Sequence, residues 1–313
     1  MEQFIKEKEK ELQGQVIPQT KKEDFEAFWQ AQVAQLRTVP IQVKRKKMET
    51  PYQKLFTTWE ISYNTHDDTW IDALFTYPAN ATGKLPCVVY YHGGSLQKAL
   101  NLEIAATGVA VFAMDVRGQG GTSIDRAVYH SGDINGSVMT RGVLDREDFY
   151  MRNIFLDAVR AVDVVATLEE VDPERIVTYG GSQGGGLSIT ASALSGKSKK
   201  CYTSEPSFCC IKQRILVGSR IFGSTHEFLK KYPEETDRVF DVVSYFDVNN
   251  MVSLLKVPTL FALGLTDDVC LPRFVYSAYT HAECEKELII MPFTPHCQGR
   301  LYKERIHDEF ANM

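Results

Sequence analysis

The sequence lacks several features that would place it on a membrane or on nucleic acid. Its 313 residues carry 35 basic and 40 acidic side chains, so there is no basic excess to attract nucleic acid. The Lys- and Glu-rich start, residues 1–13, contains no apolar core of a signal peptide. The longest apolar runs, such as 109–114, fall far short of the roughly 18 residues that a membrane span needs. We therefore expect a cytoplasmic protein that binds neither nucleic acid nor membrane.

Motifs for metals and phosphates are missing as well. The seven cysteines are irregularly spaced, form no CxxC pair and show no Cys/His spacing typical of zinc sites, which indicates reduced thiols. No glycine loop ends in Gly-Lys-Ser/Thr, and no GxGxxG is followed by an acidic residue about 20 positions later. The sequence thus predicts no metal and no nucleotide cofactor.

No linker, low-complexity tract or internal repeat divides the chain, which predicts a single domain over residues 1–313. Residues 1–45 have the pattern of a helical extension. Within it, Thr20 and Glu23 have capping-box spacing, and Pro40 follows the expected helix end. Apolar residues at helical spacing give this helix one face to bury: Phe25, Phe28, Trp29, Val33 and Leu36.

Short apolar segments alternate with helical patterns in the rest of the chain. Residues 55–59 and 73–77 are expected to form antiparallel strands. Mostly apolar runs, typical of strands buried on both faces, follow at 87–91, 109–114, 176–179, 259–263 and 288–291. A helical pattern such as 148–170 lies between them. The alternation predicts a doubly wound, mostly parallel α/β sheet, whose ligands bind at the carboxyl ends of the strands.

Residues 201–250 fit this alternation least well. The segment is long for a connection and has its own helical stretch at 226–232. It is interpreted either as a lid or oligomer-interface insertion over the strand ends, or as an ordinary pair of surface helices.

The strongest chemical signal is Gly180-Gly181-Ser182-Gln183-Gly184. It matches G-x-S-x-G between a predicted strand and a small-residue helix, the context of a nucleophile elbow in an α/β-hydrolase. Glycine at 180 and 184 avoids clashes with neighbouring backbone, and the strained turn exposes Ser182. The alternative is a glycine-rich turn that only packs a helix against a strand.

In this fold the acid and the base follow the serine in the order Asp, His. Of the later histidines, His281 lies on a predicted helix and His307 on the C-terminal helix, whereas His296 directly follows the last strand. His296 is therefore the predicted general base. Asp267 and Asp268 both follow the strand before it, and spacing alone does not choose between them.

The oxyanion hole needs two backbone N–H donors. One is expected from Gln183, which follows the nucleophile, and the other from Tyr91 in Tyr91-His92-Gly93-Gly94. His92, beside this loop, is predicted to have a structural hydrogen-bonding role. Arg117 is expected to donate to loop carbonyls rather than to be a surface cation.

Together these motifs resemble carbohydrate esterase family seven, the acetyl xylan esterase and cephalosporin C deacetylase family of α/β-hydrolases. The resemblance covers nearly the whole chain. It is carried by Arg117-Gly118-Gln119-Gly120, the Ser182 elbow, Gly264-Leu265-Thr266-Asp267, His296 and the stretches 142–145, 155–161 and 243–247.

The resemblance implies Ser182 as nucleophile, Asp267 as acid, His296 as base and Tyr91 and Gln183 as oxyanion donors. Two further residues, Arg117 and Gln119, would support the site structurally. The implied activity is hydrolysis of acetyl esters of sugars, xylo-oligosaccharides or related small molecules through an acetyl-serine, without metal or cofactor. The resemblance also implies a homohexamer whose active sites face an internal cavity.

The chain departs from the family pattern near the expected site. The family usually has Gly-His-Glu at the base, where this chain has Pro295-His296-Cys297, so the support of the histidine loop must differ. Cys270-Leu271-Pro272 replaces Cys-Pro-Pro, and 204–208 differs from the usual Tyr-Pro-Tyr type. No elbow presents Cys297, so a bystander thiol is expected there. The alternatives are a catalytically inactive scaffold that binds ligands, or a hydrolase for other acyl or peptide substrates.

Overall fold

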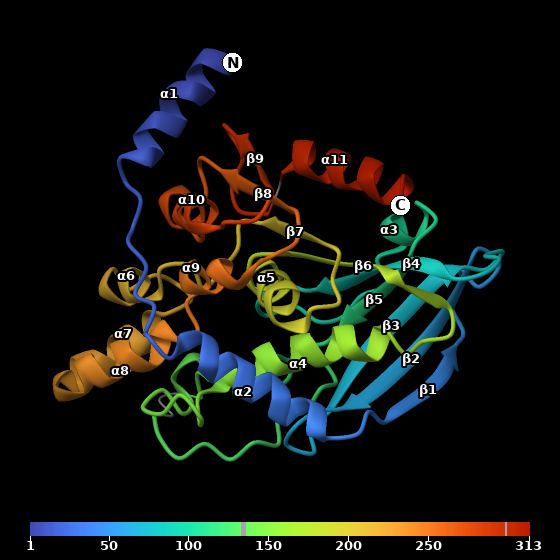
Figure 1. The fold of residues 1–313 in the computed structure, drawn as a ribbon, viewed down its shortest axis with the longest axis horizontal. Coiled ribbons are helices and arrows are strands. Elements are labelled where there is room, and N and C mark those ends of the chain that lie inside the picture. The colour runs from blue at the N-terminus through green and yellow to red at the C-terminus, as the bar shows by residue number, and fades with distance from the viewer. Residues whose placement is uncertain (133–135, 298) are drawn as a thin grey trace.

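A computed structural model describes residues 1–132, 136–297 and 299–313. Within these residues, nine strands form one mixed sheet in the order β1-β2-β3-β5-β4-β6-β7-β8-β9 (Figure 1). The strands are β1 (Val43–Met48), β2 (Phe56–Asn64), β3 (Trp70–Pro78), β4 (Leu85–Tyr91), β5 (Ala110–Met114), β6 (Val171–Gly181), β7 (Lys200–Ser204), β8 (Thr259–Gly264) and β9 (Lys286–Met291).

The first three strands pair antiparallel, and β3 pairs antiparallel with β5. From β5 onward every pairing is parallel. The chain leaves β4 for β5 on one side and later returns as β6 on the other side, so the strand order reverses at β4. Such a reversal opens a crevice at the carboxyl ends of the two strands, which here end at Tyr91 and Gly181.

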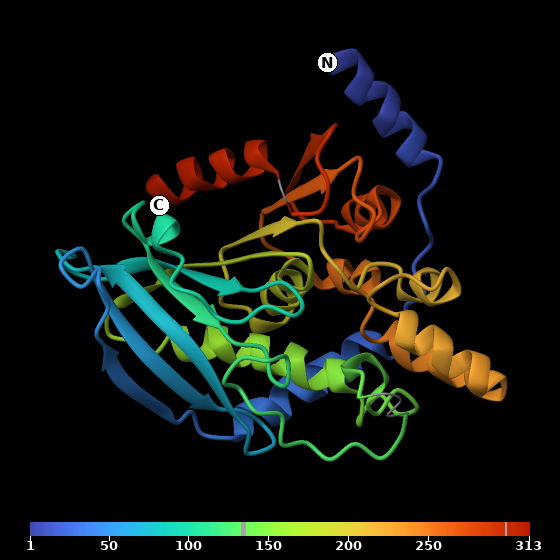
Figure 2. The ribbon, with the colours of Figure 1, turned by 180° about the vertical axis from the view of Figure 1, so that it is seen from behind.

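Helices cover both faces of the sheet (Figures 1 and 2). One face packs against α2, α4 and α5, and the other against α3 and α11. The helices are α1 (Glu2–Gln13), α2 (Phe25–Thr38), α3 (Leu102–Ala105), α4 (Tyr150–Val165), α5 (Gln183–Ser195), α6 (Ile211–Leu216), α7 (Gly223–Lys231), α8 (Thr236–Ser244), α9 (Val248–Met251), α10 (Pro272–His281) and α11 (Arg300–Ala311), with short 3-10 turns at Val138–Thr140, Pro233–Glu235 and Val252–Leu254.

Alternate residues of the central strands belong to different cores, as a side-chain period of two requires. In β4, Cys87 and Val89 face the α4 side, whereas Val88 lies in the core under α11. Because both faces are buried, the strands are apolar throughout, which is the pattern that predicted them.

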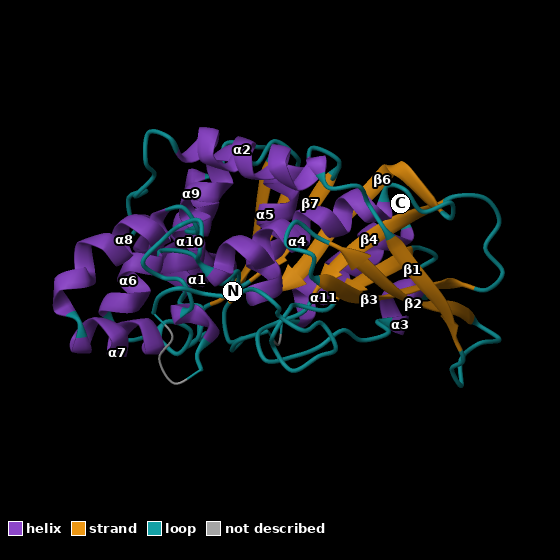
Figure 3. Cartoon of the chain, turned by 90° about the horizontal axis from the view of Figure 1, so that it is seen from below, coloured by secondary structure: helices purple, strands orange, loops and turns teal. Residues whose placement is uncertain are grey.

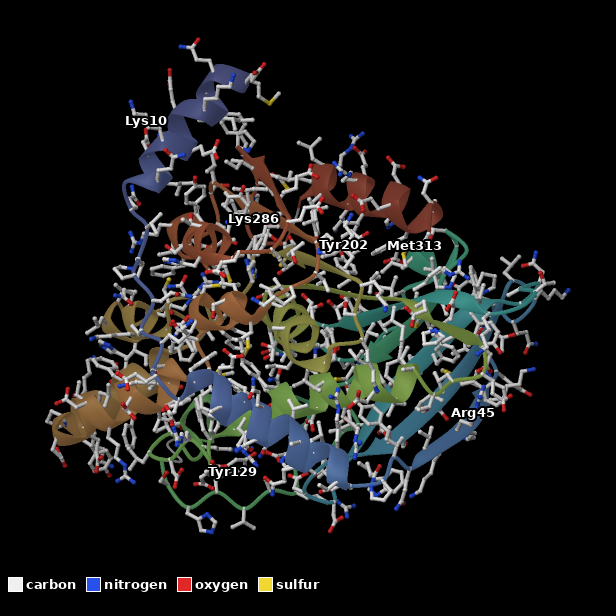
Figure 4. All side chains as sticks on the ribbon, viewed as in Figure 1. Lys10, Arg45, Tyr129, Tyr202, Lys286 and Met313 are labelled. Atoms are coloured by element: carbon white, nitrogen blue, oxygen red, sulfur yellow. The ribbon has the colours of Figure 1, made fainter. Side chains whose placement is uncertain are left out.

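The sequence analysis missed β1 and β7. β1 is an edge strand composed largely of Lys and Arg, among them Arg45 (Figure 4). Such residues protect an edge strand from pairing with another chain. They also leave the strand without a hydrophobic pattern that would predict it. β7 has the sequence Lys-Cys-Tyr-Thr-Ser, which contains no apolar run. The predicted boundaries at 45 and 201 therefore fall inside strands of the sheet.

The N-terminal region packs into the main hydrophobic core through α2. Although Lys10 on α1 lies away from the body of the molecule (Figure 4), Trp29 of α2 is fully buried and its Nε1 donates to the Tyr245 carbonyl at 2.9 Å. The predicted capping box is wrong: α2 begins at Phe25, and the Thr20 hydroxyl accepts a hydrogen bond from the Asn250 side chain at 3.1 Å. Pro40 does follow the helix end.

The segment after β7 forms α6, α7 and α8, which lie at the end of the molecule opposite β1–β3 (Figure 3). The helical stretch expected at 226–232 is confirmed as α7. None of the helices in the described part of the chain is long and apolar enough to cross a membrane.

Candidate active site

Ser182 lies in a strained turn between β6 and α5. Its φ of 55° and ψ of −123° are in a region that L-residues rarely adopt. A Cβ at Gly180 would come within 2.3 Å of the Gly184 backbone, and one at Gly184 within 1.9 Å of the Tyr91 carbonyl oxygen. The two glycines are therefore required for β6 to pass into α5 at this angle, as the G-x-S-x-G pattern predicted.

Asp267 and His296 are hydrogen-bonded at the carboxyl ends of β8 and β9. His296 Nδ1 lies 2.7 Å from Asp267 Oδ2, and Oδ1 accepts from the backbone N–H groups of Val269 and Cys270, both at 2.8 Å. These bonds fix the buried carboxylate and leave His296 Nε2 as the acceptor. Asp268 instead faces Arg220 at 3.6 Å with both side chains largely exposed. The geometry thus selects Asp267, which spacing alone left open.

Ser182 and His296 are not hydrogen-bonded to each other in the described part of the chain. Ser182 Oγ lies 3.1 Å from Ser207 Oγ, and His296 Nε2 lies 3.6 Å from Cys297 Sγ. A serine–histidine contact of this kind commonly tightens only when substrate binds. The structure thus pairs two of the three predicted triad residues, Asp267 and His296, whereas the contact between His296 and Ser182 is not formed.

Cys297 contacts the predicted general base, whereas the sequence analysis expected a bystander thiol. Its thiol contacts the imidazole and would also lie 3.4 Å from a Cβ at Gly181. Desolvation, followed by the nearby Glu205 carboxyl, raises the pKa of the Cys297 thiol well above its usual range, which keeps it protonated. Cys297 is therefore a weak hydrogen-bond donor to His296 in this arrangement.

Of the two predicted oxyanion donors, Gln183 lies in the elbow and Tyr91 at the end of β4, which pairs with β6. Gln183 is the first residue of α5, so its N–H has no partner within the helix, and the helix dipole favours negative charge there. Tyr91 ends β4 opposite Gly180 of β6. Its side chain turns away, and its hydroxyl donates to the Ala158 carbonyl at 2.8 Å.

Gln119 braces this region directly. Its side-chain amide and that of Gln183 donate to each other, both at 2.8 Å, and Gln119 Nε2 also lies 3.1 Å from the Tyr150 hydroxyl. His92 is structural, as expected: Nε2 accepts from Val116 N–H at 2.9 Å, and Nδ1 lies 2.8 Å from the Gly93 carbonyl.

The Arg117 side chain pairs with carboxylates, not with the loop carbonyls that we expected. The fully buried guanidinium donates to Asp157 of α4 at 2.6 and 2.7 Å and to Asp67 at 2.6 and 3.1 Å. Burial alone would lower the pKa of Arg117, but the two carboxylates raise it well above its ordinary value. The sequence shows no local sign of these partners, because they come from two distant segments.

Replacing Arg117 with methionine should lower the free energy of unfolding by about 3–5 kcal/mol, because it leaves the buried Asp157 carboxylate without a cation. Urea unfolding of purified variants measures this. Arg300→Met is the matched control, since Arg300 is an exposed residue of α11. Equal unfolding midpoints for the two variants would contradict the assigned role.

Sequence analysis also missed Ser207, a buried hydroxyl beside the nucleophile. Besides Ser182 Oγ, Ser207 Oγ contacts Cys270 Sγ at 3.3 Å, and its N–H donates to the Ser182 carbonyl at 2.9 Å. Its position after β7, next to β6, is the signal that could have identified it.

Among the residues that the structure describes, one group has three potential metal ligands close together: Asp267, Cys270 and His296, whose ligand atoms lie within 4.8 Å of one another. Asp267 and His296 are already hydrogen-bonded to each other. We assign this group to the hydrogen-bonded pair rather than to a metal site.

Comparison with known proteins identifies the family of this chain. The model of the family described as acetyl xylan esterase (AXE1) matches residues 7–312. The chain belongs to the acetyl xylan esterase family. Acetyl xylan esterase from Paenibacillus sp. R4 superposes with a TM-score of 0.91 at 33% identity, covering 97% of this chain and 98% of that one.

Other members of the family are also similar over most of the chain. Acetyl xylan esterase 1 from Thermoanaerobacterium sp. JW/SL YS485 has a TM-score of 0.88 at 26% identity, over 97% of this chain and 98% of that one. Acetyl esterase Axe7A of Xylanibacter ruminicola is 26% identical over 89% of this chain, which spans 64% of that relative's length. The predicted family and the α/β-hydrolase fold are confirmed.

Proposed function

We propose that this protein is a serine esterase that removes acetyl groups from sugars, xylo-oligosaccharides or related small molecules. The observation that carries the proposal is the Ser182 elbow on the same sheet edge as the Asp267–His296 pair. Membership of the acetyl xylan esterase family supports the acyl group and the substrate class. The strained Ser182 turn and the hydrogen-bonded Asp267–His296 pair favour an active enzyme over an inactive scaffold.

The proposed reaction has two steps. Ser182 Oγ attacks the ester carbonyl while His296 Nε2 takes its proton, and the N–H groups of Gln183 and Tyr91 stabilise the oxyanion. The imidazolium then gives the proton to the departing sugar hydroxyl, which leaves an acetyl-serine. Water, deprotonated by His296, attacks the acetyl group, and acetate departs as Ser182 regains its proton.

An open cavity beside the oxyanion loop, lined by both apolar and polar groups, supports a sugar as the leaving group. Its volume is about 500 Å³. The loop reaches the nucleophile, because a Cβ at Gly93 would lie 3.9 Å from Ser182 Cβ. Side-chain amides, a hydroxyl and an amine suit sugar hydroxyls; the lining residues are Tyr90, His92, Ser95, Leu96, Gln97, Lys98, Ala99, Gln119 and Gly120.

Acyl-chain selectivity tests the proposal against a longer-chain esterase or a peptidase. We expect p-nitrophenyl acetate to be hydrolysed with a kcat/KM at least about tenfold above the butyrate and about a hundredfold above the octanoate ester, since each extra methylene must fit a small acyl site. Release of acetate from acetylated xylo-oligosaccharides is the matching natural assay. A folded protein that prefers octanoate or cleaves only peptides would contradict the proposal.

We further propose a cytoplasmic homo-oligomer, a hexamer by the family resemblance. All seven cysteines are free thiols, which suits a reducing compartment. Residues 201–250, beyond the part that forms β7, would contribute to the interface, because Leu216 and Val217 expose 57% of their surface and contact with another copy would cover them. Sedimentation velocity tests this, and a single boundary at the mass of one chain would contradict it.

A further inference from the structure

Arg214 is a fully buried cation in the segment after β7, and the proposed mechanism does not use it. It lies on α6, and its guanidinium donates to two backbone carbonyls: Nε to Cys209 at 2.7 Å and Nη1 to Val269 at 2.9 Å. The Cys209 carbonyl belongs to the turn that follows β7, whereas the Val269 carbonyl belongs to the loop that follows β8. Because β7 and β8 are parallel neighbours, Arg214 connects two loops at the carboxyl ends of adjacent strands.

The Val269 carbonyl is part of the peptide group that holds the proposed acid. The same peptide group carries the Cys270 N–H, which donates to Asp267 Oδ1 at 2.8 Å. The Val269 N–H donates to that oxygen at 2.8 Å as well, and the other oxygen, Oδ2, lies 2.7 Å from His296 Nδ1. One line of hydrogen bonds thus runs from the Arg214 guanidinium through a single peptide group to the Asp267–His296 pair.

A charged donor on a carbonyl strengthens the N–H on the other side of the same peptide group. The guanidinium draws electron density towards the carbonyl oxygen, which makes the amide hydrogen more positive, and hydrogen bonds in a chain reinforce one another. The bond to Val269 also fixes the plane of the peptide group, so that the Cys270 N–H keeps its direction towards Asp267. Both effects favour the orientation of the carboxylate in which Oδ2 meets His296.

The guanidinium is itself held in place. Its central carbon, Cζ, lies 5.0 Å from the ring centroid of Phe274, in the first turn of α10, which is within cation–π range. Arginine presents its donors in a rigid planar fork. The ring and the two carbonyls together therefore fix the direction in which Nη1 meets the acid loop.

We propose that Arg214 is a positioning residue for Asp267: its guanidinium holds the Val269–Cys270 peptide group, and this group holds the carboxylate that orients His296. The inference rests on the proposed esterase function. It gives the segment after β7 a role besides those of a lid or an oligomer interface, because α6 supports the acid loop within the same chain.

Steady-state kinetics of Arg214→Met with p-nitrophenyl acetate give the first measurement. We expect kcat to fall about tenfold to a hundredfold, because a less firmly held carboxylate misplaces His296. KM should stay within about threefold, since Arg214 does not line the cavity beside the oxyanion loop. Arg214→Lys, which keeps the cation and can donate to one carbonyl, should recover part of the loss. Lys212→Met removes a cation of the same helix that lies over the Phe240 ring, and this matched control should keep kcat within about twofold.

A double-mutant cycle with Asp267→Asn separates positioning from a general loss of structure. Because Arg214 acts through the Asp267 carboxylate, Arg214→Met should lower kcat by less than about twofold in the Asp267→Asn background. A structural defect would instead lower kcat by the same factor in both backgrounds. Gln119→Ala shows that a further loss is measurable. It acts through Gln183 and should lower kcat about threefold to tenfold in either background.

An equal loss from Arg214→Met in both backgrounds would overturn the inference and leave Arg214 a structural residue. A kcat of Arg214→Met within twofold of wild type would overturn it as well. Circular dichroism shows whether Arg214→Met is folded; where it is not, the same cycle is measured with Arg214→Lys, and equal factors again overturn the inference. A folded wild type without esterase activity would instead contradict the proposed function, and the inference with it.

Discussion

Ser182→Ala should reduce kcat for p-nitrophenyl acetate about a million-fold, to the level of background catalysis by the remaining site. The reason is that His296 and Asp267 act only through the serine hydroxyl, so their contribution disappears with it. Initial rates over a wide range of enzyme concentration measure this, with a circular dichroism spectrum to show that the variant is folded. Residue 182 tolerates alanine sterically, because only a hydroxyl is removed.

Ser207→Ala is the matched control for this prediction. Ser207 lies 3.1 Å from Ser182, is buried and carries the same hydroxyl. We expect the control to retain at least about a tenth of the wild-type rate, since no elbow presents Ser207. Mass spectrometry of the trapped acyl-enzyme should find the acetyl group on Ser182. Equal activity of wild type and Ser182→Ala would favour the inactive-scaffold alternative, with its activity due to a contaminant.

Asp267→Asn should lower kcat by about ten-thousand-fold with little change in fold. The asparagine side chain has nearly the same shape, but its amide can donate to Nδ1. This favours the tautomer whose proton is on Nε2, the atom that must accept the proton of Ser182. Steady-state kinetics with p-nitrophenyl acetate above pH 7 gives the measurement.

Asp268→Asn separates this effect from a general loss of charge in the same loop. Asp268 is 73% exposed and faces Arg220 on the surface, so its replacement should leave kcat within about twofold. If Asp268→Asn were the inactive variant and Asp267→Asn the active one, the hydrogen-bonded pair described above would not be the catalytic pair.

Local sequence patterns predicted most of the fold. The buried central strands are short apolar runs, and the helices between them have apolar residues at a period of 3.6, so both kinds of element can be recognised in the sequence. The strands that the sequence analysis missed are β1, whose exposed basic residues carry no hydrophobic pattern, and β7, which contains no apolar run. Missing β7 also hid Ser207, because the position of a residue after a strand is apparent only once the strand is known.

The sequence by itself determined the nucleophile elbow and the position of His296 after the last strand. The first can be recognised from the short G-x-S-x-G pattern between a strand and a helix, and the second from the order of the strands along the chain. Only the tertiary structure decided between Asp267 and Asp268 and paired Arg117 with Asp157 and Asp67. These outcomes depend on hydrogen bonds and charges between segments far apart in the chain, which no local spacing encodes.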